Sequence, residues 1–155
     1  MTSNVAKKAG FLAAAFEAEA AVLEAGGFTG EMSLATCPVK HSFGEGCYVR
    51  EWNSPAGMLV VSKVHKIAHP FFVLKGVISV ATEDGVEKIE APHYGITPAG
   101  TKRVLYVHED TQWVTVHVTD QTDLGEIEKE IIAEDPANQL DFATALKEAF
   151  LEKDK

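Results

Sequence analysis

Cysteine is scarce in this chain, which contains only two such residues, Cys37 and Cys47. They have neither the spacing of a metal-binding motif nor that of a redox Cys-x-x-Cys pair, so we expect two reduced thiols. The chain also lacks an apolar run near the roughly 20 residues of a membrane-spanning helix. Its first residues lack the uninterrupted apolar segment of a secretory signal. We therefore expect a cytoplasmic protein that does not bind membranes.

Positive charge is also in short supply. Lys and Arg number 14 against 23 Asp and Glu, which gives a formal net charge of -9 at pH 7. Because nucleic-acid binding depends largely on clustered cations, a nucleic-acid polymer is not an expected partner. Many of the cations nevertheless fall in the central segment: Arg50, Lys63, Lys66, Lys75, Lys88, Lys102 and Arg103. This uneven distribution permits a local positive pocket inside an acidic protein.

The central part of the chain has the pattern of short β-strands separated by turns. Runs rich in β-branched and aromatic residues occur at 48–52, 58–65, 71–80, 85–91, 95–97, 103–108 and 113–119. Asp84-Gly85 predicts a tight hairpin turn, because this dipeptide tolerates positive backbone dihedrals. Several short strands at regular spacing predict a β-sandwich or barrel.

Both ends of the chain have helical patterns. Apolar residues recur at helical spacing over residues 4–25, and Gly26-Gly27 ends that pattern. Asp123 and Glu126 predict the start of a second helix, and Pro136 suits the first turn of a third. With 155 residues we expect one domain: a helix over 1–27, a barrel over 28–119 and C-terminal helices over 120–155. The terminal helices either cap the barrel ends or, together with barrel edges, form a homo-oligomer interface.

Two Pro-x-Gly motifs frame the central segment. Pro55-Ala56-Gly57 opens the first, which closes at Gly76, and Pro98-Ala99-Gly100 belongs to the second. This pattern resembles that of the cupin superfamily over residues 30–119. Segments 64–71 and 100–111 are also similar to small single-domain cupin proteins often encoded by bacteriophages. The resemblance implies a mainly β fold: a cupin-type jelly-roll barrel with an N-terminal helix and two C-terminal helices outside it.

The same resemblance identifies four positions that usually bind a metal in cupins through three histidines and a glutamate. Here Lys63 stands for the first histidine and His65 for the second, while His69 takes the place of the glutamate. Arg103 occupies the histidine position of the second motif. The fold part of the signature is therefore intact, whereas its metal-binding part is broken at three of four places.

Strand alternation gives a separate reason to group these side chains. If His65 faces the barrel interior, period-two geometry places Lys63 on the same face. A buried cation is costly without a partner, and the donor fork of Arg103 suits a carboxylate or phosphate. We therefore expect a non-catalytic protein that captures a small anionic molecule and needs no cofactor, with Lys63 and Arg103 neutralising charge and His65 and His69 donating hydrogen bonds.

Further candidates for lining this pocket are His117, Phe71 and Tyr106. Cations beside aromatic rings favour a nucleotide or nucleotide-derived signal as the ligand. The resemblance to bacteriophage proteins implies that capture would sequester such a host signal.

The alternative is a metal-dependent cupin enzyme, such as a dioxygenase, isomerase or lyase, acting on a small acidic substrate. His65, His69 and His117 would then hold zinc, iron, manganese or nickel. His117 shares its strand face with Trp113 and Thr115, so its role depends on whether this face looks into the barrel or to solvent.

Other residues have simpler interpretations. Trp52 is expected to pack in the core, and Lys102 is expected to be a solvated charge beside Arg103. His41 is expected in a solvated loop, and Glu109-Asp110 in a turn between two strands.

Overall fold

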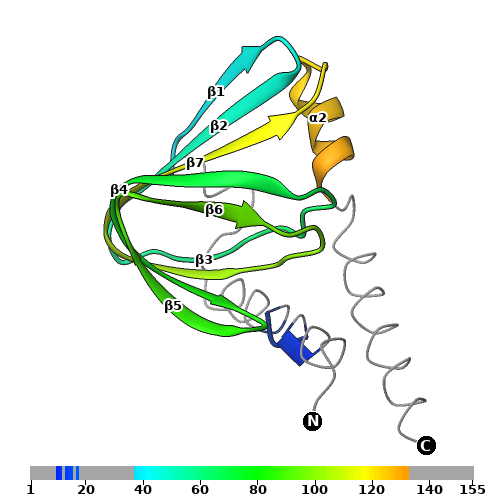
Figure 1. The fold of residues 1–155 in the computed structure, drawn as a ribbon. Coiled ribbons are helices and arrows are strands. Elements are labelled where there is room, and N and C mark those ends of the chain that lie inside the picture. Colours follow the sequence, from blue (N-terminus) through cyan, green and yellow to red (C-terminus); the bar gives the residue numbers. More distant parts are fainter. Residues whose placement is uncertain (1–9, 12, 16, 18–36, 133–155) are drawn as a thin grey trace, which may run out of the picture.

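The computed structural model describes residues 10, 11, 13–15, 17 and 37–132 (Figure 1). Its strands are β1 (Val39–Gly44), β2 (Cys47–Ser54), β3 (Leu59–Val61), β4 (His69–Thr82), β5 (Gly85–Glu90), β6 (His93–Thr97) and β7 (Val104–Val118), followed by helix α2 (Leu124–Ile131). The described residues between 10 and 17 are helical, as predicted. The rest of the predicted N-terminal helix and the helix predicted after Pro136 lie outside the described residues.

All strand pairs are antiparallel, and the order in the sheet is β1-β2-β7-β4-β5, with β3 on β7 and β6 on β4. The long strands β4 and β7 each serve two halves of the sheet. The first half of β4 pairs with β6 and its second half with β5, whereas β7 pairs first with β3 and then with β2. Figure 1 shows the resulting curl, in which β3 and β5 lie opposite β1 and β2. This is the predicted barrel-like arrangement.

The bend of the long strands depends on Gly76. The pairing of β4 with β7 shifts register between Val73 and Ile78, and Gly76 there has a φ of 98°. A Cβ atom at this position would lie 2.4 Å from the carbonyl oxygen of Asp110, so only glycine fits. The expected structural role of Gly76 therefore has a steric cause.

The hydrophobic core lies between the two halves of the sheet. Val73, Ile78 and Val107 are fully buried and pack with Trp52 and Trp113. The predicted packing role of Trp52 is therefore confirmed.

Several predicted boundaries differ from the structure. The predicted turn at Glu109-Asp110 is wrong, because both residues lie inside β7, next to the irregular pairing with β4. The predicted loop around His41 is wrong because this residue belongs to β1, whose mostly exposed side chains give no apolar alternation. The hairpin at Asp84-Gly85 is confirmed by the pairing of Thr82 with Gly85.

Helix α2 begins where the sequence predicted. The side chain of Asp123 accepts a hydrogen bond from the backbone N–H of Glu126 at 3.0 Å, as an N-cap residue does. Ile127 and Ile131 are buried and pack against Tyr48. The helix thus covers the end of the sheet where β2 begins and β7 ends. Across the described part of the chain, no helix has the length and apolar character needed to cross a membrane.

Candidate functional site

Alternating side chains of β2, β4 and β7 meet on the inner face of the sheet. Tyr48 lies opposite His117, and Thr115 lies opposite Phe71. Since His69 is two residues before Phe71 and His117 is two residues after Thr115, antiparallel pairing makes the two histidines neighbours. Val116 and Val118 on the other face of β7 are less buried than His117. The face of His117 therefore looks inward.

Three imidazoles form the centre of the site, and we call His65, His69 and His117 the histidine cluster. The ring centroids of His69 lie 4.5 Å from those of both His65 and His117, which are themselves 6.2 Å apart. His65 comes from the loop after β3, where its carbonyl accepts a hydrogen bond from Gly100 N at 2.7 Å. The three rings lie together, as the metal-binding alternative requires, and their role as ligands stays a prediction.

Two of these rings have hydrogen-bond partners within the protein. Nδ1 of His69 donates to the carbonyl of Ile67 at 3.2 Å, which leaves Nε2 of the neutral ring as an acceptor. Nε2 of His117 lies 2.9 Å from Oγ1 of Thr115. In its neutral form His69 therefore cannot donate the hydrogen bond to a ligand that the sequence predicted, because its only ring proton is already engaged.

Burial keeps the histidine cluster uncharged. Desolvation, reinforced by the neighbouring histidines and then by Arg50 and Arg103, lowers the pKa of His65 to about 3. Desolvation lowers the pKa of His117 to about 4, with smaller effects of His69 and Arg50. The pKa of His69 is also lowered, chiefly by burial, although its bond to Ile67 opposes the shift. All three rings are neutral at neutral pH.

Arg103 lies beside this cluster, as the sequence predicted. The carbon of its guanidinium is 4.8 Å from the centroid of the Phe71 ring and 5.5 Å from that of Trp113. The two rings stack at 4.7 Å. Within the described part of the chain, the buried Nε of Arg103 has no hydrogen-bond partner. The guanidinium of Arg103 thus lies over the faces of two stacked aromatic rings, one of them Phe71.

A second arginine was missed by the sequence reasoning. Arg50 on β2 lies opposite Thr115 and is half-buried, and desolvation lowers its pKa. Its charge acts on both His65 and His117. The signal was present in the alternation of β2, because Arg50 lies between Tyr48 and Trp52, which are both buried on the inner face.

Three predicted orientations are wrong. Lys63 does not point inward, because β3 ends at Val61 and the alternation stops there. Its side chain is 46% exposed, and its Nζ lies 2.5 Å from a carboxylate oxygen of Glu128. Tyr106 does not line the pocket, because it is 44% exposed on the outer face of β7, against His108.

Lys102 is the third correction, because it is 1% exposed and not solvated. Its Nζ donates to the carbonyl of Ser62 at 2.8 Å. His41 is exposed, as expected, but its Nδ1 lies 2.5 Å from the hydroxyl of Tyr48.

The histidine cluster fits a metal ion only in part. Nε2 of His69 has the lone pair that a metal requires, and a backbone carbonyl fixes its tautomer. Yet over the described ranges no three or more His, Cys, Asp or Glu side chains are arranged to hold a metal ion. His69 also takes the place of the usual glutamate, and the charges of Arg50 and Arg103 oppose a cation.

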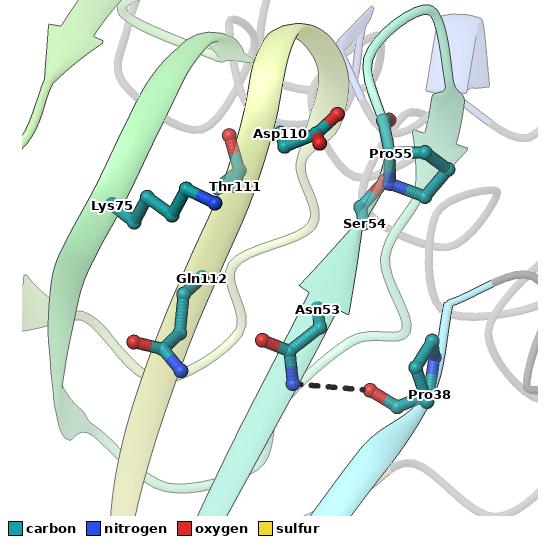
Figure 2. A pocket seen from close by; sticks show the side chains of 8 residues that line it. All are labelled: Pro38, Asn53, Ser54, Pro55, Lys75, Asp110, Thr111 and Gln112. Atoms are coloured by element: carbon teal, nitrogen blue, oxygen red, sulfur yellow. Dashed lines mark hydrogen bonds between the residues drawn. The ribbon is translucent and has the colours of Figure 1, made fainter.

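A surface groove of about 340 Å³ lies at the other end of β2 and near the middle of β7 (Figure 2). Six of its eight lining residues are polar or charged; the full set is Pro38, Asn53, Ser54, Pro55, Lys75, Asp110, Thr111 and Gln112. None of these residues belongs to the histidine cluster. The paired Trp52 and Trp113 lie between the groove and the cluster on the inner face, so these are two separate places.

Comparisons with known proteins identify the fold. No protein-family profile and no curated protein matches the chain. A mutant salicylate 1,2-dioxygenase from Pseudoaminobacter salicylatoxidans is similar in structure at 12% identity and a TM-score of 0.52, over 79% of this chain and 36% of that one. A cupin domain from Bordetella pertussis has 16% identity and a TM-score of 0.43, over 54% of this chain and 93% of that domain. A cupin-2 domain protein from Shewanella frigidimarina has 12% identity and a TM-score of 0.45, over 52% and 79%.

At such identities structural similarity shows the fold alone. The observed sheet is mainly β and antiparallel, which confirms the predicted fold class, and cupin domains are among the proteins that this chain resembles in structure. These similarities do not support the expected resemblance to bacteriophage proteins.

Proposed function

We propose that this protein is a non-catalytic cupin that captures a small anionic molecule at Arg103 and the histidine cluster. The observation that carries the proposal is the guanidinium of Arg103, which lies beside three neutral imidazoles and has a buried Nε without a partner in the described part of the chain. A carboxylate or phosphate has the charge and the acceptor oxygens that this arrangement lacks.

The energetics of Arg103 favour an anionic ligand. A buried N–H group without a hydrogen-bond partner costs roughly 1–3 kcal/mol. Glu87 acts on Arg103 through its charge, but the two residues form no salt bridge in the described structure. Phe71 and Trp113 hold the guanidinium from one side and cannot accept a strong hydrogen bond. An anion that approaches from the other side would supply the missing acceptor.

The neighbouring polar groups would orient such an anion. Each neutral imidazole carries one N–H, so His65 can donate to a ligand, and Nε2 of His69 can accept a hydrogen bond from a ligand hydroxyl. His117 can donate through Nδ1 when the hydroxyl of Thr115 donates to its Nε2. Oγ1 of Thr97 is buried and without a partner among the described residues, and Thr97 pairs directly with His69. A ligand with both an anionic group and a hydroxyl would use all of these groups.

A nucleotide or nucleotide-derived signal is the ligand class that we propose within this chemistry. It combines phosphate and hydroxyl groups with a planar base in one molecule. Sequestration of such a signal is the corresponding biological role.

Calorimetric titration with AMP, inorganic phosphate, succinate and benzoate tests this function. Arg103→Gln should weaken binding of the anion by about tenfold or more, because a charge-assisted hydrogen bond is lost in a partly buried site. Lys63→Gln is the matched control, since its exposed ammonium faces Glu128 and its loss should change affinity less than threefold. Equal affinities of wild type and Arg103→Gln for every anion would refute the proposal.

A metal-dependent cupin enzyme is the second candidate, and the tautomer of His69 favours it. Its Nδ1–H donates a hydrogen bond to the carbonyl of Ile67, so the lone pair of Nε2 is available to a ligand, as in many histidines that bind metals. His65, His69 and His117 would hold zinc, iron, manganese or nickel, and Arg103 would orient an acidic substrate.

Elemental analysis separates the two candidates. We expect no stoichiometric metal after purification without chelator, or after reconstitution with each of the four metals. Stoichiometric metal that disappears in a His65→Ala/His69→Ala variant would instead establish the enzyme candidate's metal centre.

A further inference from the structure

Arg50 gives the proposed site a second guanidinium. Arg50 lies on β2 opposite Thr115 of β7. On its other side, Thr115 pairs with Phe71 of β4, and the guanidinium of Arg103 lies over the ring of Phe71. Arg50, Thr115 and Phe71 therefore form one row across β2, β7 and β4 on the inner face of the sheet. Arg50 lies at one end of this row, and Arg103 lies over the ring of Phe71 at the other end. Both act on the same imidazole through their charges, since each contributes to the lowered pKa of His65.

Neither guanidinium is neutralised by direct contact within the described residues. Glu128 acts on Arg50 through its charge, but its carboxylate is bonded to Lys63. Glu87 acts on Arg103 without forming a salt bridge. Tyr48 and His41 also lie next to Arg50, and their polar atoms contact each other at 2.5 Å. Two half-buried cations thus act on the same imidazole, that of His65, and their burial is costly unless negative charge is supplied.

We infer that the ligand is a dianion whose two negative charges are matched by Arg50 and Arg103. The inference rests on the proposed function and narrows it to molecules such as a phosphate monoester or a dicarboxylate. Each arginine can bind an oxygen pair through its planar fork, and a ligand with one charge satisfies only one of them. Arg50 is then the residue that sets the preference for double charge.

Matched ligand pairs test this preference in the wild-type protein. Phenyl phosphate is compared with its monoanionic methyl diester, and phthalate with benzoate, by calorimetry at pH 8, where the monoester is fully dianionic. Each dianion should bind at least tenfold more tightly than its partner. The phosphate pair and the carboxylate pair separate the two sources of double charge.

Variants assign the preference to Arg50. Arg50→Gln should reduce the preference to less than threefold, because Arg103 still anchors one charge and no second guanidinium matches the other. Arg50→Lys, which keeps the charge but loses the fork, should give an intermediate preference, and Lys88→Gln on the exposed side of β5 serves as control. Circular dichroism checks that each variant is folded.

Removal of a nearby carboxylate should change the affinity for dianions in the opposite direction. Glu128→Gln removes the negative charge that acts on Arg50 and should strengthen dianion binding about two- to threefold. Glu126→Gln, which lies on the same helix and pairs with Lys129, should have no effect.

The outcomes distinguish this inference from the proposed function. Equal affinity for the two members of each ligand pair would refute the inference that the ligand is a dianion. A preference for dianions that is unchanged in Arg50→Gln would refute it too. Neither result would contradict the proposed capture of an anion. Failure of all four ligands to bind wild type would overturn both.

Discussion

Lys102 and Lys63 lie close in the fold but have opposite environments. Lys102 is buried and donates to the carbonyl of Ser62, whereas Lys63 is exposed and pairs with Glu128. The inward prediction for Lys63 assumed that the strand continues past Val61, and Lys102 was expected to be a solvated charge beside Arg103. Residues 62–64, which follow β3, belong to no strand, so the alternation that directed Lys63 inward does not extend to it.

Lys102→Met tests the structural role of the buried ammonium. The substitution retains most of the side-chain volume but removes the ammonium that donates to the part-buried carbonyl of Ser62, which costs roughly 1–3 kcal/mol. Denaturant unfolding measures the change. Lys63→Met should shift the free energy of unfolding by less than about 0.5 kcal/mol, because exposed ion pairs contribute little. Equal effects of the two substitutions would contradict the assignment.

The lowered pKa values of the histidine cluster predict acid sensitivity. His65 and His117 have folded-state pKa values of about 3 and about 4, below their ordinary value of 6.5, so the unfolded chain binds more protons in between. The contribution of these neutral rings to the free energy of unfolding is complete above pH 6.5. It is lost as the pH falls from 6.5 toward their folded-state pKa values. Each should remove roughly 1 kcal/mol per pH unit in this window.

The measurement is unfolding free energy between pH 7 and pH 4.5. His65→Gln should flatten the pH dependence relative to wild type, whereas His108→Gln, on the exposed outer face, should leave it unchanged. An unaltered slope in His65→Gln would show that this ring does not titrate as described.

Among the elements, the paired strands β4 and β7 determine where the site residues meet. Their register places His69 beside His117 and Phe71 beside Thr115. Three features were predictable because each depends on local backbone chemistry: the motif with Gly76, the hairpin after Thr82 and the N-cap at Asp123. The joining of two predicted strands into β7 was not, because it depends on pairing across the sheet. The inward direction of Arg50 was available from the alternation of β2, but its place opposite Thr115 follows only from the register of β2 with β7.

Gly76→Ala should disrupt the contact between β4 and β7. A Cβ atom would lie 2.4 Å from the carbonyl oxygen of Asp110 and 2.8 Å from Cα of Thr111, so backbone must move. Gly85→Ala is the control, since Gly85 also has a positive φ but no atom within 4 Å of the added Cβ. Both lose about 1 kcal/mol from backbone strain, and Gly76→Ala should lose at least about 2 kcal/mol more. Similar melting temperatures of the two variants would contradict this steric account.

At the scale of the whole molecule, the outer face of the sheet carries several exposed apolar side chains, among them Phe72, Tyr94, Ile96 and Val118. Barrel edges and terminal helices were expected to form a homo-oligomer, and this stays a proposal. Mass measurement in solution should give a multiple of the 16.8 kDa chain. A concentration-independent mass of one chain would refute it.

The account as a whole holds that a small anion binds between Arg103 and the histidine cluster, and not in the groove of Figure 2. Nuclear magnetic resonance of the Arg103 Nε–H and the imidazole nitrogens, during titration with phenyl phosphate at pH 8, tests this most directly. We predict saturable shifts at Arg103, His65 and His117 and none at the Gln112 side-chain amide. Shifts confined to Gln112 and the other groove residues, or no shift at all, would contradict the account.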